Sequence, residues 1–599
     1  MNPRNTWIWI IVAAALLGVI LVLEQLRPDP PPGLAPLLPG FNARIVTSVQ
    51  IGHAGQMDIR VERTNATWQI TRPVQYPAQA VSIEGLLDAL ERLAPFSHID
   101  SSELRRRPET EADFGFDPPQ ISLAIQSRRE LRQLFIGKRT APGDQVYLRV
   151  GPGVGGIYLV DADLLRVLPR SVNDWRDTGL VDLAALAFDR LVVSNANAVI
   201  EIQHQPANNS WGMNRPVRGR ADGPRLVGLL QRLHALRVGE FVTDEPAELE
   251  TYGLQSPDLE ISFLQGTNVA AVLEFGKSPA TNSTVVYARR HGLSTIVTVP
   301  KEPLTPWRGP ANDFRDPQLI AIPQPADQIE FRGPEAFVLQ RESGGTWRAA
   351  GQTFPVDSSL VSDFFRALSA LHIVQFKDAV TEPDLPEYGL ATPFRQILVR
   401  AAATNAPPPA TNIVTADLSF GATNEGRIFV RRADENPIYA VLLSEFQKLP
   451  AAVWQFRERR IWNFTTNDVV RLTIRQDGKV RQIVRQGAGS WALDQGSQGI
   501  INNFAVEEAT HRFGELTASW WLDRGEASRA AYGFTPTGLS LSFELKNGDK
   551  RNVEFGGRSA SEVPYAAVEL DGQIWVFEFP LSLYYDLVVP HLTIPAYVR

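Results

Sequence analysis

The chain contains no cysteine. This absence excludes disulfide frameworks, cysteine-ligated zinc, iron–sulfur clusters, thiol nucleophiles and a cysteine-linked lipid anchor, because each of them needs the sulfur atom. A long basic run is also missing, since 59 Lys and Arg residues stand against 66 Asp and Glu residues, for a net charge of −7. Nucleic-acid binding requires clustered positive charge, so we expect no nucleic-acid partner.

Recognisable catalytic and cofactor motifs are scarce as well. The eight histidines form no H-E-x-x-H or H-x-H pattern, so we expect neither a metal nor a cofactor. The glycine-rich stretch at 151–156 lies between two expected strands, at 146–150 and 157–160, whereas a dinucleotide site needs a helix after the glycines. The adjacent carboxylates Glu507 and Glu508 fall on an expected helix surface, and we interpret them as solvated.

The length of the chain bounds the number of its domains. The chain has 599 residues, of which 44% are hydrophobic. At roughly 100–200 residues per domain, this length predicts about three to five domains, each able to bury its own core.

The amino terminus carries one uncharged apolar segment, from Trp7 to Leu23. As a helix its seventeen residues would rise roughly 25 Å, close to the hydrocarbon thickness of a bilayer. We therefore predict a single-pass transmembrane anchor over residues 1–24. The residues expected to contact membrane lipid include Trp7, Trp9, Ile10, Leu17 and Leu23. Arg4 precedes the segment and acidic residues follow it, which predicts a cytoplasmic amino terminus with the rest of the chain outside.

Two alternatives to the anchor stay open. A cleaved signal peptide would also have a short charged start, although this apolar stretch is long and no small-x-small cleavage site follows it. A buried core helix would need polar positions on one face. Residues 25–44 are rich in proline, which lacks an N–H and has a fixed φ, so we expect a semi-rigid stalk there.

The remaining chain shows an internal repeat of roughly 140 residues. A tryptophan near a strand end recurs as Trp68, Trp211, Trp347 and Trp491. Downstream, an aromatic-Gly turn recurs at Gly115, Gly253, Gly389 and Gly533, and a strand-end glycine recurs at 137, 276, 421 and 556. Three copies then close with an aromatic-Arg-acid triplet, whose arginines are Arg176, Arg315 and Arg457. These markers divide the chain into repeat 1 (45–184), repeat 2 (185–322), repeat 3 (323–465) and repeat 4 (466–599).

Each repeat is expected to be an antiparallel sheet with one helix lying on it, an α+β fold. In repeat 2 the β-branched and alternating patterns predict strands at 191–193, 199–203, 259–264, 269–275, 285–289 and 295–299. Leucines at three- and four-residue spacing predict the helix from Asp222 onward. The corresponding helices are expected at 81–93, 359–371 and 504–516.

The recurring residues favour a structural role. A strand-end tryptophan commonly fills a core, and a glycine in a tight turn commonly supplies a positive φ. The closure arginine either ties a repeat to its neighbour or forms a solvated surface pair. A ligand groove repeated along the array is the alternative.

The anchor, the stalk and the recurring motifs together resemble the bacterial family called domain of unknown function 4340. The stretches Tyr252–Pro257, Phe275–Lys277 and Phe314–Asp316 carry this resemblance best. Repeat 4 lacks the closure triplet. Members of that family are often encoded beside ATP-binding-cassette transporters similar to those of gliding motility. The resemblance therefore implies a protein of the bacterial inner membrane, with its bulk in the periplasm, that works with such a transporter or another envelope complex.

Two functional hypotheses follow. The first is a non-catalytic scaffold or binding component anchored in the membrane. The second is a hydrolase of an envelope polymer that uses carboxylates of one diverged repeat; it requires a deep cleft with two carboxylates about 5–10 Å apart, one with a raised pKa. The sequence favours the first.

Overall fold

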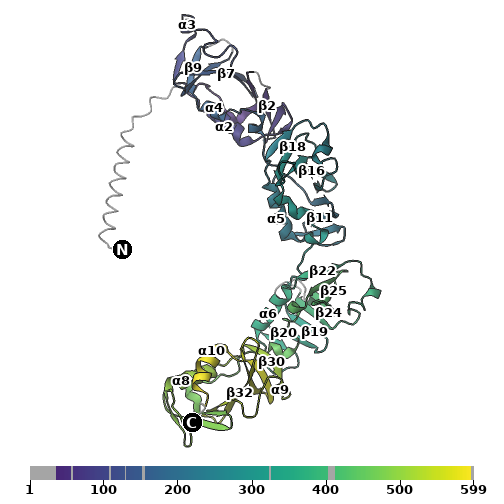
Figure 1. The fold of residues 1–599 in the computed structure, drawn as a ribbon, viewed down its shortest axis with the longest axis vertical. Helices are drawn as coiled ribbons and strands as arrows, with labels where there is room; N and C mark the ends of the chain where they lie inside the picture. Colours follow the sequence, from purple (N-terminus) through teal and green to yellow (C-terminus); the bar gives the residue numbers. More distant parts are fainter. Residues whose placement is uncertain are drawn as a thin grey trace, which may run out of the picture. The chain divides into compact units, whose positions relative to one another are not determined.

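The computed structural model describes residues 36–54, 58–65, 67–106, 109–128, 130–151, 155–322, 326–402 and 412–594. The chain divides into two compact units, Met1–Arg315 and Asp316–Arg599. Each unit contains two antiparallel sheets, and each sheet is accompanied by one helix of 12 residues (Figure 1). The tandem α+β repeats predicted from the sequence are therefore confirmed.

The first unit contains repeats 1 and 2. In repeat 1 the main elements are β1 (Val46–His53), β2 (Ile59–Thr64), β3 (Thr67–Arg72), β4 (Tyr76–Pro77), α2 (Ala80–Glu91), β5 (Ser97–Ile99), β6 (Ile121–Ser127), β7 (Leu131–Arg139), β8 (Gln145–Val150) and β9 (Ile157–Asp161). In repeat 2 they are β10 (Arg190–Asn195), β11 (Val199–Gln205), β12 (Ser210–Arg215), β13 (Gly219–Arg220), α5 (Gly223–His234), β14 (Glu240–Thr243), β15 (Leu259–Gln265), β16 (Asn268–Phe275), β17 (Val285–Arg290) and β18 (Ile296–Pro300).

The second unit contains repeats 3 and 4. In repeat 3 the main elements are β19 (Gln328–Arg332), β20 (Phe337–Arg341), β21 (Trp347–Ala349), α6 (Ser358–Ser369), β22 (Ile373–Lys377), β23 (Arg395–Ala402), β24 (Asn412–Asn424), β25 (Arg427–Arg432), β26 (Ile438–Leu442) and α7 (Leu443–Phe446). In repeat 4 they are β27 (Val469–Gln476), β28 (Lys479–Gly487), β29 (Ser490–Leu493), α8 (Asn503–Gly514), β30 (Trp520–Arg524), β31 (Ser540–Leu545), β32 (Lys550–Arg558), β33 (Pro564–Leu570) and β34 (Gln573–Glu578).

The four sheets share one strand order, except that the nine-stranded sheets of repeats 1 and 2 have an additional two-residue edge strand, β4 or β13, and the described sheets of repeats 3 and 4 have eight strands. In repeat 2 the strand order is β13-β12-β11-β10-β15-β16-β17-β18-β14. Two meanders are joined through their first strands, β10 and β15. The main helix follows the first meander, and the strand after it lies at the opposite edge, paired with the last strand of the second meander. The chain thus crosses from one edge of the sheet to the other through the helix.

The main helices form where apolar side chains recur at helical spacing. In α5 the buried residues are Leu226, Leu229 and Leu233, and they join strand residues such as Leu191 and Ile202 in one core. Asp222 caps this helix, because its side chain accepts a hydrogen bond from the Arg225 N–H at 3.0 Å. The predicted start of the helix is confirmed, as are the strands predicted in this repeat.

The sequence analysis missed the two-residue strands β4 and β13 and one further strand of each repeat. This further strand follows the main helix and lies at the sheet edge, as β5, β14, β22 and β30. These strands have 3 to 5 residues, too few for alternation of polar and apolar residues to be recognised. Only their pairing with the last strand of the sheet defines them.

The amino-terminal prediction falls mostly outside the described residues. The anchor segment, with Trp7, Trp9, Ile10, Leu17 and Leu23, lies outside them, and within them no helix is both long and apolar enough to cross a membrane. Residues 36–44, which the sequence analysis assigns to the stalk, pack on repeat 1. Leu38 and Ala43 are buried in its core, and the Leu37 N–H donates to the Leu93 carbonyl at 2.8 Å.

Candidate functional site

The aromatic-Gly turns bring two glycines of each repeat into close contact. Gly115, Gly253, Gly389 and Gly533 all have a positive φ, between 66° and 81°. In repeat 2 the Tyr252 carbonyl accepts a hydrogen bond from the Lys277 N–H at 3.1 Å. A Cβ on Gly276 would lie only 2.2 Å from that carbonyl oxygen. Both glycines are therefore required by backbone packing. We call this contact between the turn glycine and the strand-end glycine the lock, and it recurs in every repeat.

Each lock is completed by an aromatic pair. The turn aromatic packs edge-on against an aromatic side chain of the second meander, with ring centroids 4.9–5.1 Å apart. The pairs are Phe114–Tyr147, Tyr252–Tyr287, Tyr388–Phe429 and Tyr532–Tyr565. Edge-to-face packing of this kind is favourable beyond the buried area alone. The turn is thus fastened to the sheet by its backbone and by its ring.

The marker tryptophans pack against the cores of their repeats, and they divide into two kinds. Trp68 and Trp491 are buried, and their indole N–H groups donate to Glu84 at 2.9 Å and Glu507 at 2.8 Å. Trp211 and Trp347 are half-buried and pack against His204 and Phe365. Among the residues that the structure describes, the marker tryptophans that donate a hydrogen bond to the main helix are those of the first and last repeats.

The interpretation of Glu507 as a solvated helix carboxylate is wrong. Its carboxylate also accepts from Arg485 at 3.1 Å, and that guanidinium stacks over Trp491 with its carbon 4.1 Å from the ring centroid. Glu508 instead forms a more exposed ion pair with Arg512, one helical turn away, at 2.9 Å. Two neighbouring carboxylates thus have different roles, because α8 turns one toward the sheet.

The closure triplets fasten each repeat to its own main helix. The aromatic residues Trp175, Phe314 and Phe456 are almost completely buried. Their carbonyls accept from the residue that precedes the main helix, as in Asp222 N–H to Phe314 O at 2.9 Å. The following arginine forms an isolated antiparallel bridge to the same pre-helix segment, at Ala78, Ala221 and Val356.

The residues just after each triplet pair with the next repeat. Gly179 forms a bridge with Arg237, which follows helix α5, and Arg460 forms the corresponding bridge with Thr517, which follows α8. Within the second unit, Gln318 forms a bridge with His372. The linkers between repeats 1 and 2 and between repeats 3 and 4 are therefore held by backbone bridges on both sides, with two residues between the two bridges.

Arg176 joins repeats 1 and 2 across this linker. Its side chain is only 2% exposed and donates to Asp244 of repeat 2 at 2.6 Å. The guanidinium carbon lies 4.7 Å from the ring centroid of Phe241, in repeat 2, and 5.5 Å from that of Tyr76, in repeat 1. A cation between two aromatic rings is attracted by both of them. Arg176 therefore holds repeats 1 and 2 together through contacts with one ring of each.

Tyr76 is affected by the same environment. Burial raises its pKa to about 12, and the negative charge of Asp177 adds to this effect. The phenol therefore stays neutral well above the ordinary tyrosine pKa and leaves the ring available to Arg176.

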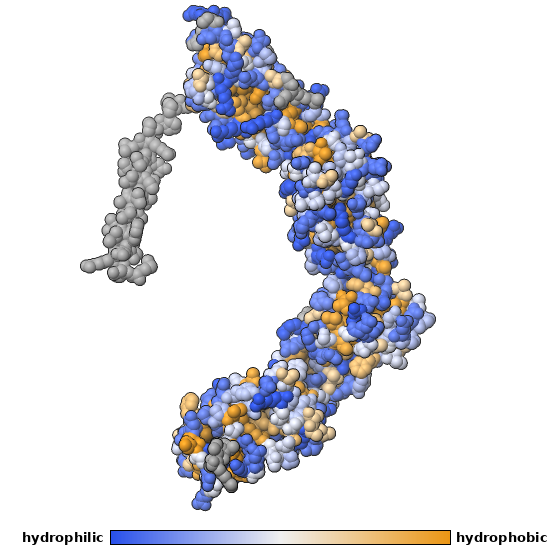
Figure 2. All heavy atoms as spheres, viewed as in Figure 1, coloured by the Kyte–Doolittle hydropathy of each residue, from blue (hydrophilic) through white to orange (hydrophobic). Residues whose placement is uncertain are grey.

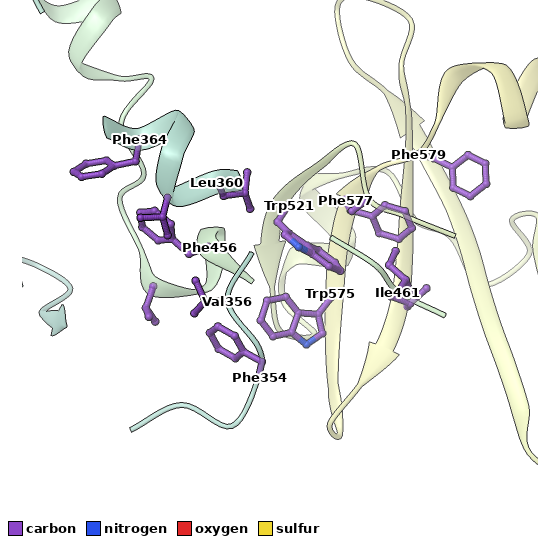
Figure 3. Packing of buried hydrophobic residues seen from close by; sticks show 14 of the residues in the cluster. Phe354, Val356, Leu360, Phe364, Phe456, Ile461, Trp521, Trp575, Phe577 and Phe579 are labelled. Carbon is purple, nitrogen blue, oxygen red and sulfur yellow. The ribbon is translucent and has the colours of Figure 1, made fainter. Parts of the chain in front are cut away.

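Arg457 joins repeats 3 and 4 in the same way, at the side chains Phe354 and Trp575 that Figure 3 shows near each other. Its guanidinium carbon lies 4.4 Å from the Trp575 ring and 5.5 Å from the Phe354 ring, and the two rings contact each other edge-on at 6.0 Å. The carboxylate partner is Asp571, at 3.0 Å. The Trp521 indole N–H donates to the Arg457 carbonyl at 3.1 Å. Repeat 4 thus supplies an aromatic ring, Trp575, and a carboxylate, Asp571, to the closure arginine of repeat 3.

Comparison with known families agrees with the repeat structure. A family model described as Domain of unknown function (DUF4340) matches the chain at residues 68–210, 211–393 and 347–537. The chain is a DUF4340 protein. No curated protein and no solved structure matches it. The three matches begin at Trp68, Trp211 and Trp347, so each covers most strands of one sheet, a closure triplet and the first part of the next repeat.

Arg315 is the third closure arginine of this DUF4340 chain. It lies at the end of the first unit, is 4% exposed, and donates to the Asn312 side chain at 3.4 Å. Its backbone forms the bridge to Ala221. The three closure arginines are therefore all buried in the structure.

The carboxyl pKa values that are shifted within the described residues are all lowered. Hydrogen bonds from Thr110 lower the pKa of Asp113, those from Thr381 lower the pKa of Asp384, and the bond from Arg400 lowers the pKa of Glu330. A general acid in glycoside cleavage needs the opposite shift. Over the same residues, no three His, Asp or Glu side chains gather as metal ligands.

Surface hollows occur in several repeats, on a surface that is mostly hydrophilic with small apolar areas (Figure 2). A hollow of about 510 Å³ in repeat 1 is lined partly by Arg166, Arg170 and Asp174. A cavity of about 710 Å³ in repeat 3 is lined mainly by apolar residues and contains no carboxylate. The strands on either side of the glycine-rich stretch at 151–156, β8 and β9, pair antiparallel with each other, and a strand, not the helix that a dinucleotide site would require, follows the glycines.

The sequence analysis identified the closure arginines but missed their partners. Asp244, Phe241, Trp575 and Asp571 belong to the next repeat in each case. Two different carboxylate positions are used, after β14 in repeat 2 and in the β33–β34 turn of repeat 4. Alignment of the repeats alone therefore could not have identified them.

Proposed function

We propose that this DUF4340 protein is a non-catalytic scaffold or binding component, anchored in the bacterial inner membrane, with its four repeats in the periplasm. It works with an ATP-binding-cassette transporter or another envelope complex. The observation that supports a scaffold is the use of the closure arginines: Arg176 and Arg457 are buried between aromatic rings of consecutive repeats and are not presented to a substrate. The apolar segment Trp7–Leu23 supports the anchor.

The absence of cysteine allows a direct test of topology. We would introduce a single cysteine as Asn5→Cys, before the apolar segment, or as Asn208→Cys, an exposed position between β11 and β12. A membrane-impermeant maleimide added to intact spheroplasts should label N208C and leave N5C unlabelled until the membrane is permeabilised. Labelling of N5C alone, or recovery of the full chain in the soluble fraction, would contradict the proposal.

The partner is tested by crosslinking in intact cells, followed by solubilisation and purification of the full-length chain. We expect transporter subunits or other envelope proteins to be recovered. A chain lacking residues 1–24, exported by a cleavable signal, is the matched control for the contribution of the anchor. Recovery of no envelope protein with the full-length chain would contradict a scaffold role.

A further inference from the structure

Repeat 3 has a charged residue where the other repeats have aliphatic ones. Arg395, at the start of β23, pairs with Phe420 of β24. At the equivalent position of the sheet, Leu259 pairs with Phe275 in repeat 2, and Ile121 pairs with Ile136 in repeat 1. In repeat 4 the position belongs to Leu539, whose carbonyl accepts from the Phe555 N–H at 2.9 Å. Arg395 is nevertheless only 8% exposed, so a cation occupies what is elsewhere an apolar position.

This buried cation has no carboxylate partner among the described residues. Its one hydrogen bond goes from Nη1 to the Pro450 carbonyl at 3.3 Å. Its guanidinium also lies over the ring of Phe446, at 5.2 Å, and of Phe394, at 5.7 Å. The buried Arg176 and Arg457, by contrast, each have a carboxylate within 3.0 Å. Burial lowers the pKa of Arg395, as expected for a buried cation without a nearby negative charge.

Arg395 lines the apolar cavity of repeat 3. The cavity has a volume of about 710 Å³, within the range typical of small-molecule sites. Its apolar wall includes Phe394, Ile428, Leu443, Phe446 and Leu449. Phe394 is 51% exposed, so one side of this wall is open to solvent. Arg395 is the only charged residue of the lining.

We propose that this cavity binds an anionic amphiphile, a molecule with an acyl chain and a carboxylate or phosphate head. The head pairs with the Arg395 guanidinium, since a planar guanidinium suits bidentate binding of either group. The acyl chain lies against the apolar wall. This inference goes beyond the proposed scaffold function and depends neither on the anchor nor on a transporter.

The test uses the full-length chain in lipid nanodiscs and photoreactive acyl probes of one chain length. The probes carry a carboxylate, a phosphate or an alcohol head. We expect the carboxylate or the phosphate probe, or both, to label peptides that line the cavity, around residues 389–395 and 443–451, at least tenfold more than the alcohol. Acetate and inorganic phosphate in excess should not displace them, because a free anion lacks the acyl chain.

Variants separate binding from folding. Arg395→Leu introduces the residue of repeats 2 and 4, so it should lose labelling by the anionic probes and melt at the same or a higher temperature. Arg366→Leu removes an exposed charge on α6 of the same repeat and should label as the natural chain does. Ala451→Trp obstructs the cavity from an exposed lining position and should lose labelling by every probe.

The outcomes decide the proposal. Equal labelling by the alcohol and the anionic probes, unchanged labelling of R395L, or full displacement by inorganic phosphate would overturn it. A lowered melting temperature of R395L with unchanged labelling would assign Arg395 a structural role instead. Should R395L fail to fold, unchanged labelling of A451W would still overturn the proposal.

Discussion

At the scale of single residues, the strand-end glycine that packs against each aromatic-Gly turn is required because a Cβ would not fit, and not because its backbone needs a positive φ. Gly276 has backbone oxygen atoms of Tyr252 and Gly253 within 3 Å of the position that a Cβ would occupy. Gly228, on helix α5 of the same repeat, has nothing within 4 Å. The same residue type therefore has opposite consequences at two positions of one repeat.

Replacement of these two glycines by alanine gives the first prediction. Gly276→Ala should lower the free energy of unfolding by about 2 to 4 kcal/mol, because the backbone cannot yield without breaking the lock. Gly228→Ala should raise it by about 0.5 to 1 kcal/mol, because alanine favours a helix. Urea denaturation followed by circular dichroism measures both, and equal effects of the two changes would refute the interpretation of the lock.

Arg457 gives a second prediction at this scale. Arg457→Ala should cost about 2 to 4 kcal/mol, since it removes a buried cation from between two aromatic rings and leaves a hole beside Trp575. Asp571→Ala should cost about 1 kcal/mol or less, because the Asp571 side chain is 61% exposed and its ion pair is screened by water. Arg366→Ala, at an exposed helix position, is the control. A larger loss for D571A than for R457A in urea denaturation would show that the ion pair, and not the stacking, holds the repeats.

At the scale of secondary-structure elements, the main helix is fastened to the sheet in two ways. In repeats 2 and 3 the helix depends on apolar contacts such as those of Trp211 and Trp347. In repeats 1 and 4 a glutamate on the helix also accepts from the marker tryptophan and from an arginine of the adjoining strand. These two helices are also the ones nearest the ends of the array in sequence.

A prediction for α8 compares two adjacent carboxylates. Glu507→Ala should lower the free energy of unfolding by about 1 to 3 kcal/mol, because it leaves the Trp491 indole N–H and the mostly buried Arg485 without this partner. Glu508→Ala should cost about 0.5 kcal/mol or less, because it removes a partly exposed pair within one helix. Thermal and urea denaturation measure the difference. Equal losses of unfolding free energy for the two variants would mean that the contact of Glu507 with the sheet contributes little to stability.

At the scale of the molecule, the two units differ in how their cores are organised. In the first unit, repeats 1 and 2 have separate main cores, and Arg176 bridges them from the linker. In the second unit, one continuous core runs from Leu319 to Leu592 and includes residues of both repeats. Phe354 and Trp454 of repeat 3 contact Trp575 of repeat 4 within this core.

The continuous core predicts cooperative unfolding of repeats 3 and 4. Residues 316–599, produced alone, should melt in a single calorimetric transition whose calorimetric and van't Hoff enthalpies agree. Phe354→Ala removes a ring from the shared part of the core and should broaden or split that transition. Two well-separated transitions in the unsubstituted unit would show that its repeats fold independently.

The repeat length, the order of strands and helix, and the role of the turn glycines followed from local patterns alone. Periodic leucines define α5, alternation defines strands such as β15, and an aromatic-Gly turn restricts φ wherever it occurs. The edge strands such as β14 were missed, because a short segment takes its conformation from the strand beside it. Glu507 was misjudged for a related reason, since the face of a helix that meets a sheet depends on packing.

Local sequence patterns do not reveal the contacts between consecutive repeats. Arg176 and Arg457 are recognisable as repeated residues, yet their partners come from the next repeat and occupy different positions in it. Arg395 is one arginine among many in the sequence, and only the register of β23 shows that it replaces a core aliphatic residue. Local residue order determined the repeating fold, because helix and strand periodicity act over a few residues. Tertiary structure decided which charges are buried and what they face, because burial depends on segments distant in the chain.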